Sequence, residues 1–79
     1  MKYILVSEKE EAVAAFRKMG VEAVLASTDE IALESVSNAI SCRKTGTLIV
    51  SEHVREISGS ILRDHEACGR LPFVMTLPE

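Results

Sequence analysis

Four short apolar segments recur along the chain, and a stretch with helical spacing of apolar residues follows each of the first three. The segments cover residues 3–6, 21–26, 47–50 and 72–75. They are nearly continuous in apolar residues and do not alternate with polar ones, which is typical of parallel strands that helices cover on both faces. The pattern therefore predicts a small α/β sandwich with four strands and three helices.

Polar residues mark the expected starts of the first two helices. Residues 7–10 and 27–30 both have the spacing of a capping box, in which a hydroxyl and a carboxylate satisfy two free helix amides. The capping residue is expected to be Ser7 in the first helix and Ser27 or Thr28 in the second. Both helices are therefore predicted to begin directly after a strand.

The third helix is predicted to be continuous from Ser51 or Glu52 to the end of its apolar stripe. Residues 58–60 weaken it, because glycine in a helix interior costs roughly 1 kcal/mol relative to alanine. The stripe nevertheless keeps its phase across this segment, so we expect a single helix. The stripe consists of Val54, Ile57, Ile61, His65 and Cys68.

The connections between the strands predict the order of the sheet. Parallel strands joined through a helix form right-handed crossovers in nearly all proteins. We therefore expect a four-stranded parallel sheet in the order 2-1-3-4, in a three-layer sandwich with helices on both faces. The last strand, expected over residues 71–77, begins near Pro72, which an edge strand tolerates. The whole chain, residues 1–79, is expected to form one domain.

Composition and charge exclude several classes of partner. The net charge is −3, whereas proteins that bind nucleic acids need a clustered excess of Lys and Arg. No apolar stretch approaches the roughly 18 residues that a membrane span requires, and the N-terminus has no signal-peptide pattern. We therefore expect a cytoplasmic protein that neither binds nucleic acid nor inserts into the membrane.

The residue types that most often carry chemistry give no candidate catalytic, cofactor or metal site. No glycine-rich phosphate-binding motif follows a strand, and the paired acids of a phosphoacceptor domain are missing. We expect His53 to be exposed near the start of the third helix and His65 to pack at the edge of its stripe. Cys42 and Cys68 form no metal-binding motif, so we expect two small core residues, with a disulfide or redox pair as the alternative. The sequence therefore does not predict an enzyme.

Hydroxyl groups follow the first three expected strands, at the positions where open α/β sheets bind ligands. They belong to Ser7, Ser27, Thr28 and Ser51. Together with the helix N-termini they could hold an anion, and the chain would then be a small ligand- or phosphate-sensing regulatory domain. Each residue also stands where helix capping alone would select it, and we expect the capping role.

Three segments resemble the F subunit of the V-type ATP synthases of archaea and bacteria. The sequence AFRKMGV at residues 15–21 resembles the end of that family's first helix. TLIVSEHV at residues 47–54 is similar to its junction between a strand and a helix, and LPFVMTLP at residues 71–78 to its last strand. The three segments occur in the family's order and at about its spacing, and together they span the chain.

The resemblance implies a four-stranded parallel α/β fold and a role in a rotary machine. The F subunit is a non-catalytic part of the central stalk. It binds the coiled-coil D subunit and helps to couple ATP hydrolysis or synthesis to ion transport. We therefore expect no catalytic residue and no cofactor, a protein partner, and a cytoplasmic location at the periphery of the membrane.

Two differences from the family bear on this expectation. The family usually has Gly-Asp after its first strand, where this chain has Ser7 and Glu8. The family also continues past its last strand with a loop and a C-terminal helix that reaches along the stalk, whereas this sequence stops at Glu79. Either the sequence is the globular part of a longer chain, or it is a short relative that lacks this helix.

The last strand is the first candidate for a binding surface. An apolar strand at the edge of a sheet exposes unpaired backbone groups, and a partner usually covers them. The candidate interface residues are Phe73, Met75 and Leu77. A protein partner or a second copy of the chain could pair there. Alternatively, Pro72 and Pro78 could protect the edge without any partner.

Overall fold

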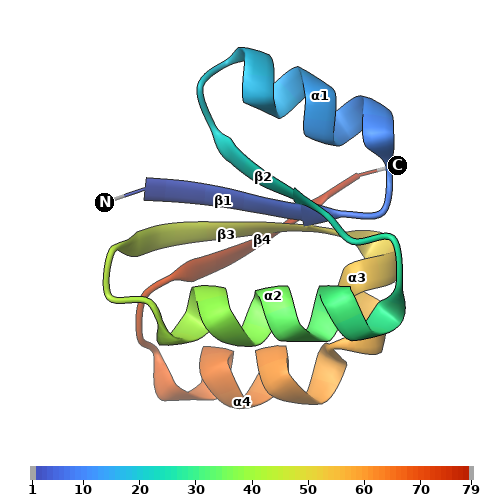
Figure 1. Ribbon diagram of the computed structural model, residues 1–79. Coiled ribbons are helices and arrows are strands. Elements are labelled where there is room, and N and C mark those ends of the chain that lie inside the picture. Colours follow the sequence, from blue (N-terminus) through green and yellow to red (C-terminus); the bar gives the residue numbers. More distant parts are fainter. Residues whose placement is uncertain (1, 79) are drawn as a thin grey trace.

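The computed structural model describes residues 2–78, which form four strands and four helices (Figure 1). The elements follow one another as β1 (Lys2–Ser7), α1 (Glu10–Lys18), β2 (Glu22–Leu25), α2 (Asp29–Ser41), β3 (Thr45–Ser51), α3 (Glu52–Ile57), α4 (Gly59–Cys68) and β4 (Phe73–Leu77). Among these residues no helix is both long and apolar enough to cross a bilayer.

The four strands form one parallel sheet in the order β2-β1-β3-β4, as the sequence predicts. β1 and β3 therefore occupy the centre, and β2 and β4 form the two edges. The register aligns Tyr3 with Thr47 and Thr47 with Phe73, so these three residues form a row across the sheet. The next row on the same face consists of Ala23, Leu5, Ile49 and Met75.

Helices cover both faces of the sheet, but unequally. Figure 1 shows α1 alone on one side of the sheet, and α2, α3 and α4 on the other. The larger core lies under the three helices and contains Ile4, Val6, Leu48, Val50 and residues of α2, α3 and α4. The smaller core lies under α1 and contains Leu5, Val13, Ala23 and Ile49. The strands β1 and β3 are nearly continuous in apolar residues because both of their faces are buried along most of their length.

The segment that we expected to form one long third helix is divided at Ser58. α3 ends before this residue and α4 begins after it. The Ser58 side chain is buried, and its hydroxyl donates to the Val54 carbonyl oxygen at 2.5 Å. The same carbonyl also accepts the Ser58 amide. A hydroxyl that bonds back to the preceding turn favours a bend, so the third crossover consists of two helices and the expectation of one continuous helix is wrong here.

The division also changes which residues are buried. The buried positions are Val54, Ser58 and Leu62, which follow one another at intervals of four residues. Ile61, which the expected stripe contains, is only partly buried, and Leu62 takes the core position. The Ser58 hydroxyl has its hydrogen-bond partner within the helix, and this polar residue can therefore be buried. A pattern of apolar residues in the sequence does not indicate a buried serine.

The two cysteines are not the core residues that we expected. Cys42 is half-buried and caps the C-terminus of α2, and Cys68 is exposed as the last residue of α4. Both are free thiols. Each lies at the end of a helix and not between the layers, so its sulfur can be reached from solvent.

Candidate functional site

The edge strand β4 carries the most exposed apolar side chains of the sheet. β4 pairs with β3 on one side, and its other side is an open edge. Phe73 is 68% exposed and Met75 is 55% exposed, whereas Leu77 is partly buried against the core under α1. Of the three candidate interface residues, two are thus free to contact a partner and the third fixes the strand to the domain.

Two residues from the central strands extend this surface. Tyr3 in β1 is 55% exposed, and Thr47 in β3 is half-buried. Side chains two residues apart share a face of a strand, so both point to the same side as Leu5 and Ile49, which pack under α1. We call Tyr3, Thr47, Phe73 and Met75 the β4 surface. Its exposure arises because α1 packs mainly on β2 and β1.

The sequence alone predicts only the β4 half of this surface. Tyr3 and Thr47 were missed because their place depends on the register, which aligns Tyr3, Thr47 and Phe73 in one row. The sequence did contain one indication of this surface. In the first apolar segment, the large Tyr3 lies two positions before the buried Leu5 and therefore on the same face of the strand. None of the four side chains of the β4 surface is charged, so it suits an apolar partner surface with a few hydroxyl groups.

The rim at the carboxyl ends of the strands is held by a hydrogen bond between distant parts of the chain. Ser51 is 2% exposed, and its hydroxyl donates to Glu8 Oε1 at 2.5 Å. Ser51 Oγ also accepts the Val54 amide at 3.2 Å and so caps α3. One serine therefore satisfies a helix start and a carboxylate that lies 43 positions earlier in the chain.

The hydrogen bond from Ser51 lowers the pKa of the Glu8 carboxyl from its usual value of 4.5. Partial burial opposes this effect, and the Glu8 amide, His53 and Lys9 add smaller contributions in the same direction as Ser51. Glu8 is therefore ionised at neutral pH. Nearby, His53 Nε2 lies 3.3 Å from Asp29 Oδ1, with both side chains largely exposed.

The remaining hydroxyls of the predicted anion rim have separate roles. Thr28 Oγ1 accepts the Ile31 amide at 3.2 Å, which confirms Thr28 as the cap of α2. Ser7 Oγ accepts the Lys9 amide at 3.1 Å, and α1 begins later, with Lys9 as its N-cap. The prediction that Ser7 caps the first helix is therefore wrong, because its hydroxyl closes the turn before it. Ser27 is exposed.

The charge along this rim is unfavourable for an anion. A shallow hollow beside the start of α3 is lined by Glu8, Glu52 and Glu56, together with Lys9 and His53. Three carboxylates repel a phosphate in this position, and the buried Ser51 hydroxyl already serves Glu8. The four hydroxyls thus lie near the carboxyl ends of the strands, but they do not form a common anion-binding site.

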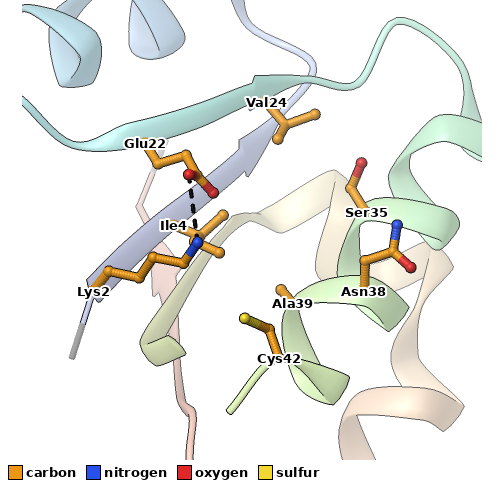
Figure 2. A pocket seen from close by; sticks show the side chains of 8 residues that line it. All are labelled: Lys2, Ile4, Glu22, Val24, Ser35, Asn38, Ala39 and Cys42. Atoms are coloured by element: carbon orange, nitrogen blue, oxygen red, sulfur yellow. Dashed lines mark ion pairs between the residues drawn. The ribbon is translucent and has the colours of Figure 1, made fainter. Parts of the chain in front are cut away.

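A second hollow lies between the edge strand β2 and helix α2 (Figure 2). It has a volume of about 260 Å³ and is lined by Ile4 and Val24 in the sheet and by Ser35, Asn38, Ala39 and Cys42 at α2. Lys2 and Glu22 form an ion pair of 3.5 Å across the two strands. Figure 2 shows Cys42 at the end of α2, on the side where Lys2 lies.

The histidines lie where the sequence placed them and do not form a site. His53 is exposed in the first turn of α3. His65 is half-buried, and its Nε2 lies 2.7 Å from the Pro72 carbonyl oxygen, so this nitrogen carries the proton and donates. Within residues 2–78, no group of three His, Cys, Asp or Glu side chains is placed to hold a metal ion.

No protein-family model matches the chain, and no curated protein matches it at a significant level. The resemblance to the F subunit therefore stays a prediction, which depends on the three segments at residues 15–21, 47–54 and 71–78.

Proposed function

We propose that this chain is a non-catalytic docking domain in the central stalk of a V-type ATP synthase or ATPase. It binds the coiled-coil D subunit and helps to couple ATP hydrolysis or synthesis to ion transport. The observation that carries the proposal is the β4 surface, an uncharged face with three large exposed side chains beside an open sheet edge. The location that follows is cytoplasmic, at the periphery of the membrane within the complex.

The size of the β4 surface sets what the partner must contribute. Tyr3, Phe73 and Met75 leave together roughly 300 Å² of side-chain area to cover, given that an aromatic residue buries about 150–250 Å² in full. At about 25 cal/mol/Å² this area is worth about 7 kcal/mol, whereas association itself costs about 4–15 kcal/mol. The β4 surface therefore acts as an anchor, and a stable complex needs further contacts around it.

A coiled coil fits this anchor better than an extended peptide does. An extended peptide would pair with the backbone of β4 and leave the row of Tyr3, Thr47 and Phe73 uncovered. A helix laid across the face presents apolar residues at intervals of three and four positions and covers the row. The fold itself, a four-stranded parallel α/β domain, is the one that the resemblance implies.

The alternative, an anion- or phosphate-sensing domain, finds less support in the geometry. The hollow at this rim is lined by three carboxylates, and three of the four hydroxyls, those of Ser7, Thr28 and Ser51, accept backbone amides of their own turns. Self-association through the β4 edge is a second alternative, which the same experiment detects.

The test is a titration of the purified chain against the D subunit of the same organism, measured by size-exclusion chromatography with light scattering. We expect a one-to-one complex. Met75→Glu places a charge on the β4 surface and should abolish it. Thr76→Glu is the matched control, because Thr76 is exposed on the same strand but points to the opposite face.

Two results would contradict the proposal. One is the lack of a complex at tens of micromolar, both for this chain and for any longer natural form with a C-terminal helix. The other is a complex that Met75→Glu leaves unchanged, since the β4 surface would then not be the contact. A homodimer of the free chain that Met75→Glu dissociates would instead assign the surface to a second copy.

A further inference from the structure

A hollow at the amino-terminal end of β3 joins the end of α2 to the loop before β4. It has a volume of about 310 Å³, and its lining residues are Ile40, Ser41, Cys42, Arg43, Thr45, Arg70 and Leu71. Cys42 also lines the hollow between β2 and α2 shown in Figure 2. Its thiol therefore stands between two solvent-accessible hollows, at the end of the domain opposite to the carboxyl rim.

Thr45 gives this hollow a polar group that the fold does not use. The side chain is 1% exposed, and its Oγ1 has no hydrogen-bond partner within residues 2–78. Buried hydroxyl groups in folded proteins nearly always have a partner. Thr45 is a neighbour of Cys42, since the Thr45 backbone amide donates to the Cys42 carbonyl oxygen at 3.2 Å and both residues line the hollow. A negative charge at this sulfur would supply the missing acceptor.

The surroundings of Cys42 favour its thiolate. The pKa of the thiol is lowered, first by the Lys44 backbone amide and then by the Thr45 hydroxyl. Burial opposes the shift, while Lys2 and the Thr45 amide add to it. The C-terminal end of α2 disfavours an anion through the helix dipole, so these local donors outweigh it. A thiolate is the form that attacks disulfides.

The charges around the hollow indicate which ligand would be accepted. Arg43 and Arg70 both line it beside Cys42, and both side chains are exposed. Arginine binds carboxylates through paired hydrogen bonds. A small molecule attached to Cys42 in this hollow would thus be held best if it carried carboxylates.

We propose that Cys42 is a site of reversible mixed-disulfide formation with a low-molecular-weight disulfide that carries carboxylates, of the class of glutathione disulfide. The Cys42 thiolate attacks one sulfur, the disulfide bond of the small molecule breaks, and a new bond joins Cys42 to that half. The other half leaves as a thiolate and takes up the proton that Cys42 lost. Cys42 is oxidised and the released thiol is the reduced product, so the step needs no further oxidant. The proposal does not depend on the stalk function.

The chain contains its own control, because Cys68 is exposed and Cys42 is only half-buried. If accessibility alone decided the rate, Cys68 would react first. The experiment incubates the folded chain with glutathione disulfide and follows both cysteines by peptide mass spectrometry. We expect Cys42 to be modified faster than Cys68, because its lowered pKa leaves a larger fraction of the thiol as the reactive thiolate. Dithiothreitol should restore the free thiol.

Two variants and a second disulfide distinguish the contribution of the Thr45 hydroxyl from that of Arg43 and Arg70. Thr45→Val keeps the shape and removes the hydroxyl, so it should slow the modification of Cys42 and leave Cys68 unchanged. Arg43→Gln combined with Arg70→Gln should slow the reaction of Cys42 with glutathione disulfide more than its reaction with cystamine, a cationic disulfide. Circular dichroism establishes that each variant is folded. If Thr45→Val does not fold, two other results test the proposal. They are the rates of Cys42 and Cys68 in the natural chain, and the rates of the Arg43→Gln, Arg70→Gln variant with the two disulfides.

Three results would overturn the proposal. The first is modification of Cys68 as fast as that of Cys42 in the natural chain. The second is an equal rate of Cys42 with the anionic and the cationic disulfide, which would exclude a role for Arg43 and Arg70. The third is a bond between Cys42 and Cys68 that forms without any mixed disulfide.

Discussion

Ser51→Ala should be the most informative single change at the carboxyl rim, because this serine makes two hydrogen bonds with different energetics. Its hydroxyl accepts the Val54 amide at the start of α3 and donates to the Glu8 carboxylate. The alanine variant removes both, whereas Glu8→Gln removes only the charge from the second and keeps an oxygen that can accept. The two variants together separate the helix cap from the charged hydrogen bond.

The magnitudes follow from the two contacts. Loss of a serine N-cap costs about 1 kcal/mol. A hydrogen bond to a charged group is worth about 1.5–3 kcal/mol when buried, and the partial exposure of Glu8 reduces this to about 1 kcal/mol. We therefore expect Ser51→Ala to lower the free energy of unfolding by about 2 kcal/mol at neutral pH. Glu8→Gln should lower it by less than about 1 kcal/mol, because the Gln oxygen still accepts a neutral hydrogen bond.

The assay is urea unfolding of the two single variants, the double variant and the natural chain, followed by circular dichroism over a range of pH. The folded pKa of Glu8 lies below its usual value of 4.5. The stabilisation by its charge is therefore complete above that value and is lost as the pH falls through the folded pKa. The difference between the natural chain and Glu8→Gln should be constant near neutral pH and vanish once the pH has fallen below the folded pKa of Glu8. The contribution of the Ser51 helix cap to the free energy of unfolding should remain at low pH.

Two observations would refute this reasoning. If the difference between the natural chain and Glu8→Gln does not change with pH, the charged hydrogen bond does not contribute to stability. If the effects of Ser51→Ala and Glu8→Gln simply add in the double variant, the two side chains are not coupled. The expected coupling is less than about 1 kcal/mol, since Glu8→Gln removes only the charge from the shared hydrogen bond.

Four further variants test the packing and the ends of α3 and α4. Leu62→Ala should destabilise the fold by about 2–5 kcal/mol, because Leu62 is 1% exposed. Ile61→Ala should cost clearly less, since Ile61 is only partly buried. Thermal unfolding that ranks the two variants in the reverse order would contradict the observed pattern of buried residues. Ser58→Ala should cost about 1 kcal/mol by removing the buried bond to the Val54 carbonyl, and a crystal structure should show a straighter helix. Gly69→Ala should cost about 1–2 kcal/mol in urea unfolding, because Gly69 ends α4 with φ of 67°; an unchanged midpoint would exclude this strain.

The strands and their order were predictable because each depends on a local pattern and one general rule. Apolar runs identified the strands, and right-handed crossovers then fixed the order that the structure has. Thr28 and Ser51 were predictable as caps for the same reason, since a cap bonds an amide three residues away. Ser7 looked identical in sequence, but its hydroxyl bonds the amide of Lys9, two residues on, and α1 starts later.

The features that sequence reasoning missed depend on contacts between distant residues or on buried polar groups. The Glu8–Ser51 hydrogen bond joins residues 43 positions apart. The β4 surface needed the register of three strands to bring Tyr3 beside Phe73. The division at Ser58 needed a buried hydroxyl that an analysis of apolar stripes treats as exposed. Each of these depends on tertiary packing, which a local pattern does not contain.

The position of β4 has a consequence for how the domain exchanges with solvent. β4 is held by one ladder of hydrogen bonds to β3 and by two partly buried side chains, Val74 and Leu77, while its other three residues are exposed. Opening this strand alone exposes much less apolar area than unfolding the sheet, so its amides should exchange with deuterium faster than those of β1 and β3. A partner on the β4 surface would raise the free energy of that opening by its own binding energy. The exchange rate of the last strand would thus report whether the domain is free or docked.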